Sequence, residues 1–154
     1  MSWELAYNHL KEKGFEDRAI QFEVSSATVA LAAEALGCAP AHIAKTLSFE
    51  QGEGCILVVA AGDRKVDNRL FKERFGMKAK MLSAERVSAL LGHAVGGVCP
   101  FGVTCPVYLD ESLKRFETVY PACGTASSAV RLSPEELFAL SGALEWVNVT
   151  KAAE

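Results

Sequence analysis

Several common features are missing from this sequence of 154 residues. No apolar run approaches the roughly 18 residues of a membrane-spanning helix, since the longest, Cys55–Ala61, has the length of a strand. The first residues lack the charged-then-apolar order of a signal peptide. Intrinsic disorder is excluded, because 50% hydrophobic residues are enough for a core. We therefore expect one domain over residues 1–154, located in the cytoplasm, without membrane contact.

The cysteine and histidine patterns indicate neither a metal site nor a disulfide framework. The five cysteines form no CxxC pair, and the three histidines show neither HExxH nor HxH spacing. Structural zinc needs four clustered ligands, and disulfide frameworks occur in secreted chains that are dense in cysteine. We expect mostly buried, reduced thiols, with no metal and no cofactor.

The net charge of −3 hides one basic segment. Residues 63–80 carry seven basic and three acidic side chains, which gives +4 locally and leaves −7 on the rest of the chain. Such a segment can bind a polyanion, because the local field rather than the net charge steers binding. A solvated helix face is the alternative, and charge alone favours it.

The hydrophobic periodicity predicts a mixture of helices and strands without strict βαβ alternation. Helices are expected at residues 3–10, 29–36, 68–75 and 84–91, and from Pro134 to near Gly142. Strands are expected at residues 20–24, 45–49, 55–61, 80–82, 107–109, 118–120, 129–132 and 145–149, the second and third as a hairpin. This order predicts an α+β domain with a mixed, strongly twisted sheet and helices packed around it.

The glycine- and proline-rich segment 95–102, VGGVCPFG, is the strongest candidate for a functional loop. Glycine lets backbone approach a ligand, and proline fixes the shape of the loop. Such a loop can direct backbone N–H groups at a phosphate or a developing oxyanion. It lacks the Gly-Lys-Ser/Thr ending of a Walker loop and the strand–turn–helix frame of a dinucleotide fingerprint. A tight connection without function is an equally weighted alternative.

Lys45 is out of place at the start of an apolar strand, in the sequence IAKTL. A lysine at a strand end in a cleft can bind phosphate, whereas an edge-strand lysine serves only to prevent aggregation. The glycine-led segments 62–64 and 124–128 are candidates to line the same cleft, although plain turns are more common. No nucleophile–base pair stands out. We expect Cys99 to be an inert small residue, because the sequence offers nothing to lower its thiol pKa.

Together these motifs resemble the YbaK/prolyl-tRNA-editing family. The resemblance runs from about residue 25 to residue 149 and rests on HIAKTL, ILVVAAGDRKVD, GGVCPFG, PVYLDESL, VYPACGTASSAVRLSPEELFAL and the closing WVNV, in that order. It implies a single editing domain with a partly barrel-like sheet. It also implies a deacylase that hydrolyses mischarged aminoacyl-tRNA, typically tRNA(Pro) carrying Ala or Cys, with Ser- or Thr-charged tRNA as substrates of relatives. The implied partner is tRNA, and a synthetase partner is left open.

The resemblance also implies which residues form the site. The family's lysine falls on Lys45, and its GxxxP motif falls on Gly96 and Pro100, which gives the candidate catalytic set. The candidate substrate-binding residues are Thr46, Gly97, Cys99, Gly102 and Gly124. The basic segment would hold the acceptor stem, through Arg64, Lys65, Arg69, Lys72 and Arg74. Because Thr46 and Cys99 depart from common family residues, the substrate amino acid is open.

Two other classes of function fit the same residues. One is a non-catalytic module that binds charged tRNA or a nucleotide in this cleft. The other is a hydrolase of a different small ester or thioester.

Overall fold

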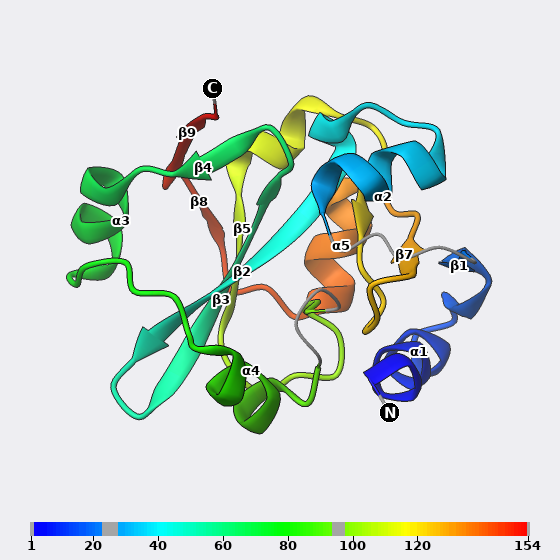
Figure 1. Ribbon diagram of the computed structural model, residues 1–154, viewed down its shortest axis with the longest axis horizontal. Coiled ribbons are helices and arrows are strands. Elements are labelled where there is room, and N and C mark those ends of the chain that lie inside the picture. The colour runs from blue at the N-terminus through cyan, green and yellow to red at the C-terminus, as the bar shows by residue number, and fades with distance from the viewer. Residues whose placement is uncertain (1, 23–27, 94–97, 154) are drawn as a thin grey trace.

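The central sheet of the protein has five strands in the order β6-β2-β3-β5-β8, in a computed structural model that describes residues 2–22, 28–93 and 98–153. The strands are β2 (Ile43–Gln51), β3 (Gly54–Ala61), β5 (Val107–Asp110), β6 (Tyr120–Pro121) and β8 (Trp146–Val147). β2 and β3 form the predicted antiparallel hairpin, and the other neighbours pair in parallel. The long hairpin crosses the molecule diagonally in Figure 1, as expected for a strongly twisted mixed sheet.

Helices cover both faces of this sheet. They are α1 (Ser2–Glu12), α2 (Val29–Leu36), α3 (Asn68–Phe75), α4 (Ala84–Leu91) and α5 (Pro134–Ser141). Alternate residues of β3 point to opposite faces, so Leu57 and Val59 join the larger core with α1, α4 and α5, while Ile56 and Val58 join a smaller core with α3. Figure 1 shows α3 on one side of the hairpin and α1 and α5 on the other.

Local signals in the sequence set the helix boundaries. Asp67 caps α3, since its carboxylate accepts a hydrogen bond from the Leu70 N–H at 3.0 Å. Ser133 and Glu136 form the predicted capping box at the start of α5. The helices predicted at residues 29–36, 68–75 and 84–91 coincide with α2, α3 and α4, which confirms those predictions.

Two predicted strands differ from the structure. Residues 80–82 form no strand; they contact β2 through one isolated bridge, between Met81 and Phe49. The strand predicted at 145–149 is instead β8 followed by β9 (Thr150–Ala152), because the chain leaves the central sheet after Val147. β9 pairs antiparallel with β4 (Arg64–Val66), a strand that the sequence did not predict.

The remaining elements are short. β1 (Ala19–Gln21) pairs antiparallel with β7 (Ser128–Val130), and the C-terminal half of the predicted strand 20–24 lies outside the described residues. Three 3-10 helices, η1 (Glu16–Arg18), η2 (Pro40–His42) and η3 (Glu111–Arg115), connect the larger elements. No helix within the described part of the chain is long and apolar enough to cross a membrane. These elements together form one mixed α+β domain, as predicted.

Candidate active site

A cavity of about 350 Å³ opens beside the outer edge of β2. Its walls come from α2, β2, the start of α4, and the connection from β6 to β7. Most lining side chains are apolar, and Lys45 is the one charged residue among the described residues that line it. A cavity of this size falls at the lower end of the range for small-molecule sites, about 300–1,000 Å³.

Among residues 2–22, 28–93 and 98–153, other segments cover the outer edge of β2 on both sides of Thr46 but not at Thr46 itself. β6 pairs with Ile43 and Ala44, and residues 80–82 bond to the backbone of Ser48 and Glu50. Because peptide groups alternate along an antiparallel strand, those of Thr46 face the same outer edge. The Thr46 hydroxyl is buried and has no hydrogen-bond partner among the described residues. The cavity wall therefore carries a polar group that is available to a ligand.

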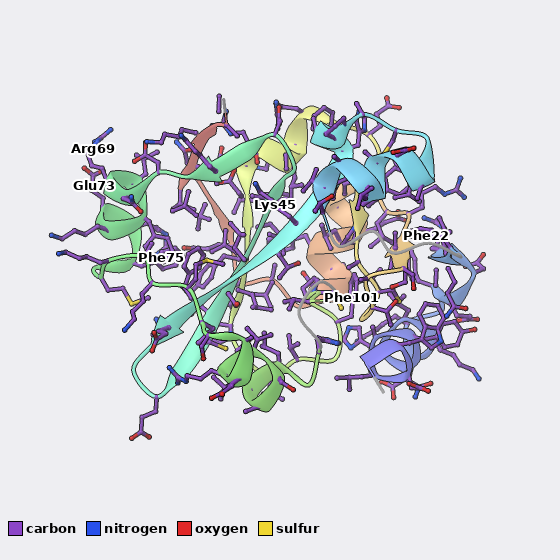
Figure 2. All side chains as sticks on the ribbon, in the orientation of Figure 1. Phe22, Lys45, Arg69, Glu73, Phe75 and Phe101 are labelled. Atoms are coloured by element: carbon purple, nitrogen blue, oxygen red, sulfur yellow. The ribbon has the colours of Figure 1, made fainter. Side chains whose placement is uncertain are left out.

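Lys45 extends from the face of β2 opposite to Thr46, toward β4 (Figure 2). The side chain is partly buried, and its ammonium group donates a hydrogen bond to the carbonyl oxygen of Arg64. Burial lowers the pKa of Lys45, and the nearby carboxylate of Asp63 partly opposes this change. Arg115 donates two hydrogen bonds to Asp63, at 2.6 and 3.1 Å, and holds the pKa of that carboxyl below its ordinary value.

A buried carboxylate holds the segment that Lys45 contacts. Asp110 is 1% exposed and accepts hydrogen bonds from the backbone of Ser112 and Val149 and from the hydroxyl of Thr150, at 2.8 to 3.0 Å. Thr150 in turn accepts two hydrogen bonds from the Arg64 guanidinium, through its hydroxyl at 3.1 Å and its carbonyl at 2.9 Å. Buried Asp110 therefore holds Thr150, Thr150 holds Arg64, and the Arg64 carbonyl holds the Lys45 ammonium. The sequence analysis missed Asp110 and Thr150.

The structure brings Cys99 next to His93, with 3.5 Å between the sulfur and Nε2. The same Nε2 lies 2.9 Å from the Phe101 carbonyl, an acceptor only, so this nitrogen carries the proton and cannot act as a base toward the thiol. Cys99 is fully buried, and burial raises the pKa of its thiol to about 12. Both observations agree with the expected inert residue. Contact between Cys99 and a substrate stays a prediction; from this segment, Val98 lines the cavity.

We expect the variant Cys99→Ala to retain the deacylase activity that the family resemblance implies, within about threefold of wild type, because the sulfur is neither ionised nor exposed. Its thermal midpoint should fall, since removing a buried sulfur leaves a small cavity. Single-turnover deacylation and a thermal melt check the two parts. Complete loss of activity in a folded variant, or an acyl group trapped on Cys99, would show nucleophilic catalysis instead.

The other predicted loop residues divide into two groups. Gly96 and Gly97 lie outside the described residues. Pro100 is buried, and Gly102 has φ +74° and packs against α1, where an added Cβ would lie 2.7 Å from Leu5. Gly102 therefore has a structural reason to be glycine. Any contact of Pro100 or Gly102 with a substrate stays a prediction.

The segment after Gly124 forms a hydrogen-bonded turn against the cavity. Gly124 has φ +87° and lies against Cys99. The Ser128 hydroxyl accepts hydrogen bonds from the backbone of Cys123 and Thr125 and donates one to the Thr125 carbonyl. Ser128 and the next residue line the cavity, so this glycine-led segment reaches the same site as Lys45.

The five predicted tRNA-binding residues are not equally free. Arg64 is held by Thr150, and Arg69 pairs with Glu73 at 3.0 Å on the outer side of α3, away from Lys45 in Figure 2. Arg74 pairs with Glu145 and lies over the rings of Phe75 and Tyr108, at 5.1 and 5.5 Å from their centroids. Lys65 and Lys72 are exposed. tRNA binding by all five stays a prediction.

Fold and cavity together describe a small α+β domain with one lysine at a ligand-sized site. The family model for the aminoacyl-tRNA editing domain matches residues 23–140. The chain therefore belongs to the aminoacyl-tRNA editing domain family, which confirms the resemblance seen in the sequence.

Similar proteins support this membership along the whole chain. The uncharacterized protein YwhH of Bacillus subtilis (strain 168) is 48% identical over 154 residues, which cover 98% of each chain. A solved structure named as a proposed trans-editing enzyme for prolyl-tRNA synthetase is 30% identical, with a TM-score of 0.88 and 98% of each chain covered. The structure of the hypothetical protein APE2540 is 29% identical, with a TM-score of 0.85, and covers 96% of this chain and 100% of its own.

Proposed function

We propose that this protein is a hydrolase that removes a small non-cognate amino acid from mischarged tRNA, acting in trans on tRNA(Pro) that carries Ala or Cys. Family membership supports aminoacyl-tRNA deacylation in general. The observation that carries the proposal is the cavity at β2. Among the described residues, Lys45 is the only charged residue that lines it, and the next residue, Thr46, has a buried hydroxyl without a hydrogen-bond partner. The name of one similar structure connects such a fold with prolyl-tRNA synthetase.

The chemistry of the substrate suits a site without a catalytic triad. An aminoacyl ester is already activated, so its hydrolysis needs a positioned water and stabilisation of the oxyanion more than a strong nucleophile. In this proposal the Lys45 ammonium binds the phosphate or ribose of the terminal adenosine. Thr46 donates to the aminoacyl group, and the backbone of the loop from Gly96 to Gly102 stabilises the oxyanion. The neighbouring ribose hydroxyl assists in activating water.

The size of the cavity supplies the selectivity. A synthetic site discriminates against a missing methylene by only about 1–3 kcal/mol, so small amino acids escape exclusion there. A second pocket that is too small for the cognate amino acid corrects the error. Large side chains in the cavity wall, among them Leu36, Met81 and Tyr120, narrow the space left for the amino acid. We propose that this volume accepts Ala or Cys and rejects Pro.

A panel of charged tRNAs tests the proposal. Single-turnover deacylation would be measured on tRNA(Pro) charged with Ala, Cys, Ser or Pro, on Ser- and Thr-tRNA, and on a generic aryl ester. We expect Ala- or Cys-tRNA(Pro) to be hydrolysed at least tenfold faster than Pro-tRNA(Pro). Binding without turnover on every substrate would indicate a non-catalytic module instead. Faster turnover of the generic ester than of any aminoacyl-tRNA would indicate a different esterase.

A further inference from the structure

The ribbon formed by β4 and β9 carries two lysines directly opposite each other. Lys65 and Lys151 are register partners in the antiparallel pairing, and both are exposed. Like charges at facing positions destabilise a sheet pair. Lys65 belongs to the basic segment of residues 63–80, whereas Lys151 is distant in sequence and joins that segment only through the fold.

The opposite face of the ribbon is fixed to the protein. Val66 packs on the smaller core, and Thr150 is buried and hydrogen-bonded to both Asp110 and Arg64. Because side chains alternate along both strands, this anchoring leaves Lys65 and Lys151 together on the outer face. The two ammonium groups are therefore presented from a rigid backbone, which reduces the entropy lost on binding a ligand.

The neighbouring acidic groups already have partners. Asp63 accepts two hydrogen bonds from Arg115, and Asp67 caps α3. The charge of Lys151 contributes to the lowered pKa of Asp67, although the hydrogen bond from the Leu70 N–H is the larger cause. The paired lysines thus lack a dedicated carboxylate of their own among the described residues.

The ribbon adjoins the cavity through one peptide group. The Arg64 carbonyl that accepts the Lys45 hydrogen bond belongs to the peptide bond joining Arg64 to Lys65. A polyanion bound at Lys65 would therefore lie one residue along β4 from the carbonyl that Lys45 contacts. By contrast, Arg69 and Arg74 on α3 are occupied by Glu73 and Glu145.

We propose that Lys65 and Lys151 form a binding surface for the phosphates of the tRNA acceptor stem, next to the cavity that receives its 3′ end. This inference rests on the proposed function for its choice of polyanion. Two adjacent cations on a fixed ribbon match a backbone that carries one phosphate per nucleotide on each strand. In this proposal the phosphate backbone of the acceptor stem lies across β4 and β9 rather than along α3.

The test measures binding, so it does not depend on turnover. Affinities for an uncharged tRNA(Pro) transcript and for its acceptor-stem hairpin would be measured over a range of salt concentrations. The protein would carry Lys65→Gln and Lys151→Gln, singly and together. A plot of log affinity against log salt has a negative slope, and each lost phosphate contact should reduce the magnitude of that slope by about 0.7–0.9. We expect the magnitude of the slope to fall by this amount once in each single variant and twice in the double variant, with both RNAs.

The matched control is Lys11→Gln with Lys13→Gln, which removes the same charge at the C-terminal end of α1 and just beyond it, on the other side of the molecule (Figure 1). The control should keep the wild-type slope. An unchanged slope in the double variant, or an equal change in the control, would overturn the proposal. A change on tRNA but not on the hairpin would place the contact away from the acceptor stem and would also overturn it. If the wild type binds tRNA but hydrolyses no charged tRNA, the proposed function fails while this surface stands.

Discussion

Replacing Lys45 with alanine should slow single-turnover deacylation of the preferred aminoacyl-tRNA by about a hundredfold or more. Lys45 supplies the only charge in the described cavity wall, and in the proposed reaction it fixes the terminal adenosine. Without that contact the ester is misplaced relative to the attacking water, and a misplacement of about 1 Å can cost about 10²-fold in rate. The measurement is the rate with saturating enzyme, so that weaker binding does not mask the chemical step.

The control for this variant is Lys11→Ala, an exposed lysine on α1, which should leave the rate and the thermal midpoint unchanged. Lys45→Ala should also remain folded, because among the described residues its ammonium makes a single hydrogen bond, to the Arg64 carbonyl of β4. A folded Lys45→Ala variant with a near wild-type rate would remove Lys45 from the site. The catalytic role would then have to come from the loop around Gly96.

The rate should also depend on pH through the same residue. Burial lowers the pKa of Lys45 below the ordinary value of 10.5. The ammonium form is therefore lost earlier than in an exposed lysine as the pH rises. We expect the enzymatic acceleration over spontaneous ester hydrolysis to fall through that lowered pKa, and Lys45→Arg, if active, to keep its acceleration to higher pH.

The sequence predicted best where local interactions decide the structure. The bounds of α3 follow from Asp67 as an N-cap and Gly76 as the αL C-cap, both of which act within one turn of the helix. The β2–β3 hairpin likewise follows from two apolar runs joined by a short turn. These features need no information from distant parts of the chain.

The errors arise where distant segments decide the structure. β4 has three residues and no hydrophobic alternation, and its partner β9 lies more than 80 positions later. The apolar residues near 80–82 suggested a strand, but they make only one bridge to β2. The chain passes from β8 to β9 because Asp110 binds Val149 and Thr150, a contact that no local pattern reveals.

In the candidate site, too, the sequence revealed features that depend on local residues and missed those that depend on distant contacts. Lys45 was predicted as a site residue because a lysine is unusual in an apolar strand, and that signal is local. Whether a basic side chain is available to a ligand depends on its tertiary partners. The sequence predicted tRNA binding equally for Arg74 and Lys65, but Arg74 pairs with Glu145. Asp110 gave only the weak signal of an acidic residue at the end of an apolar strand, in VYLD.

Asp110→Asn should lower the free energy of unfolding by about 3 kcal/mol, because hydrogen bonds to a charged group contribute about 1.5–3 kcal/mol each and unsatisfied buried donors are costly. The carboxylate accepts three hydrogen bonds, two of them on Oδ2, from the Ser112 N–H and the Thr150 hydroxyl. An asparagine amide supplies one oxygen and one NH₂ group. Whichever way the amide is oriented, its NH₂ meets a backbone N–H, from Ser112 or from Val149.

Urea unfolding measures this loss, with Glu111→Gln as the control, since Glu111 is the exposed neighbouring carboxylate. An Asp110→Asn variant as stable as the control would show that the three hydrogen bonds do not hold β9. The same variant should also lose activity well below its thermal midpoint. Thr150 holds Arg64, and the Arg64 carbonyl holds Lys45, so a released β9 lets the ammonium leave its position. A slower chemical step in a still-folded protein would therefore link the buried carboxylate to the site, whereas an unchanged rate would confine Asp110 to stability.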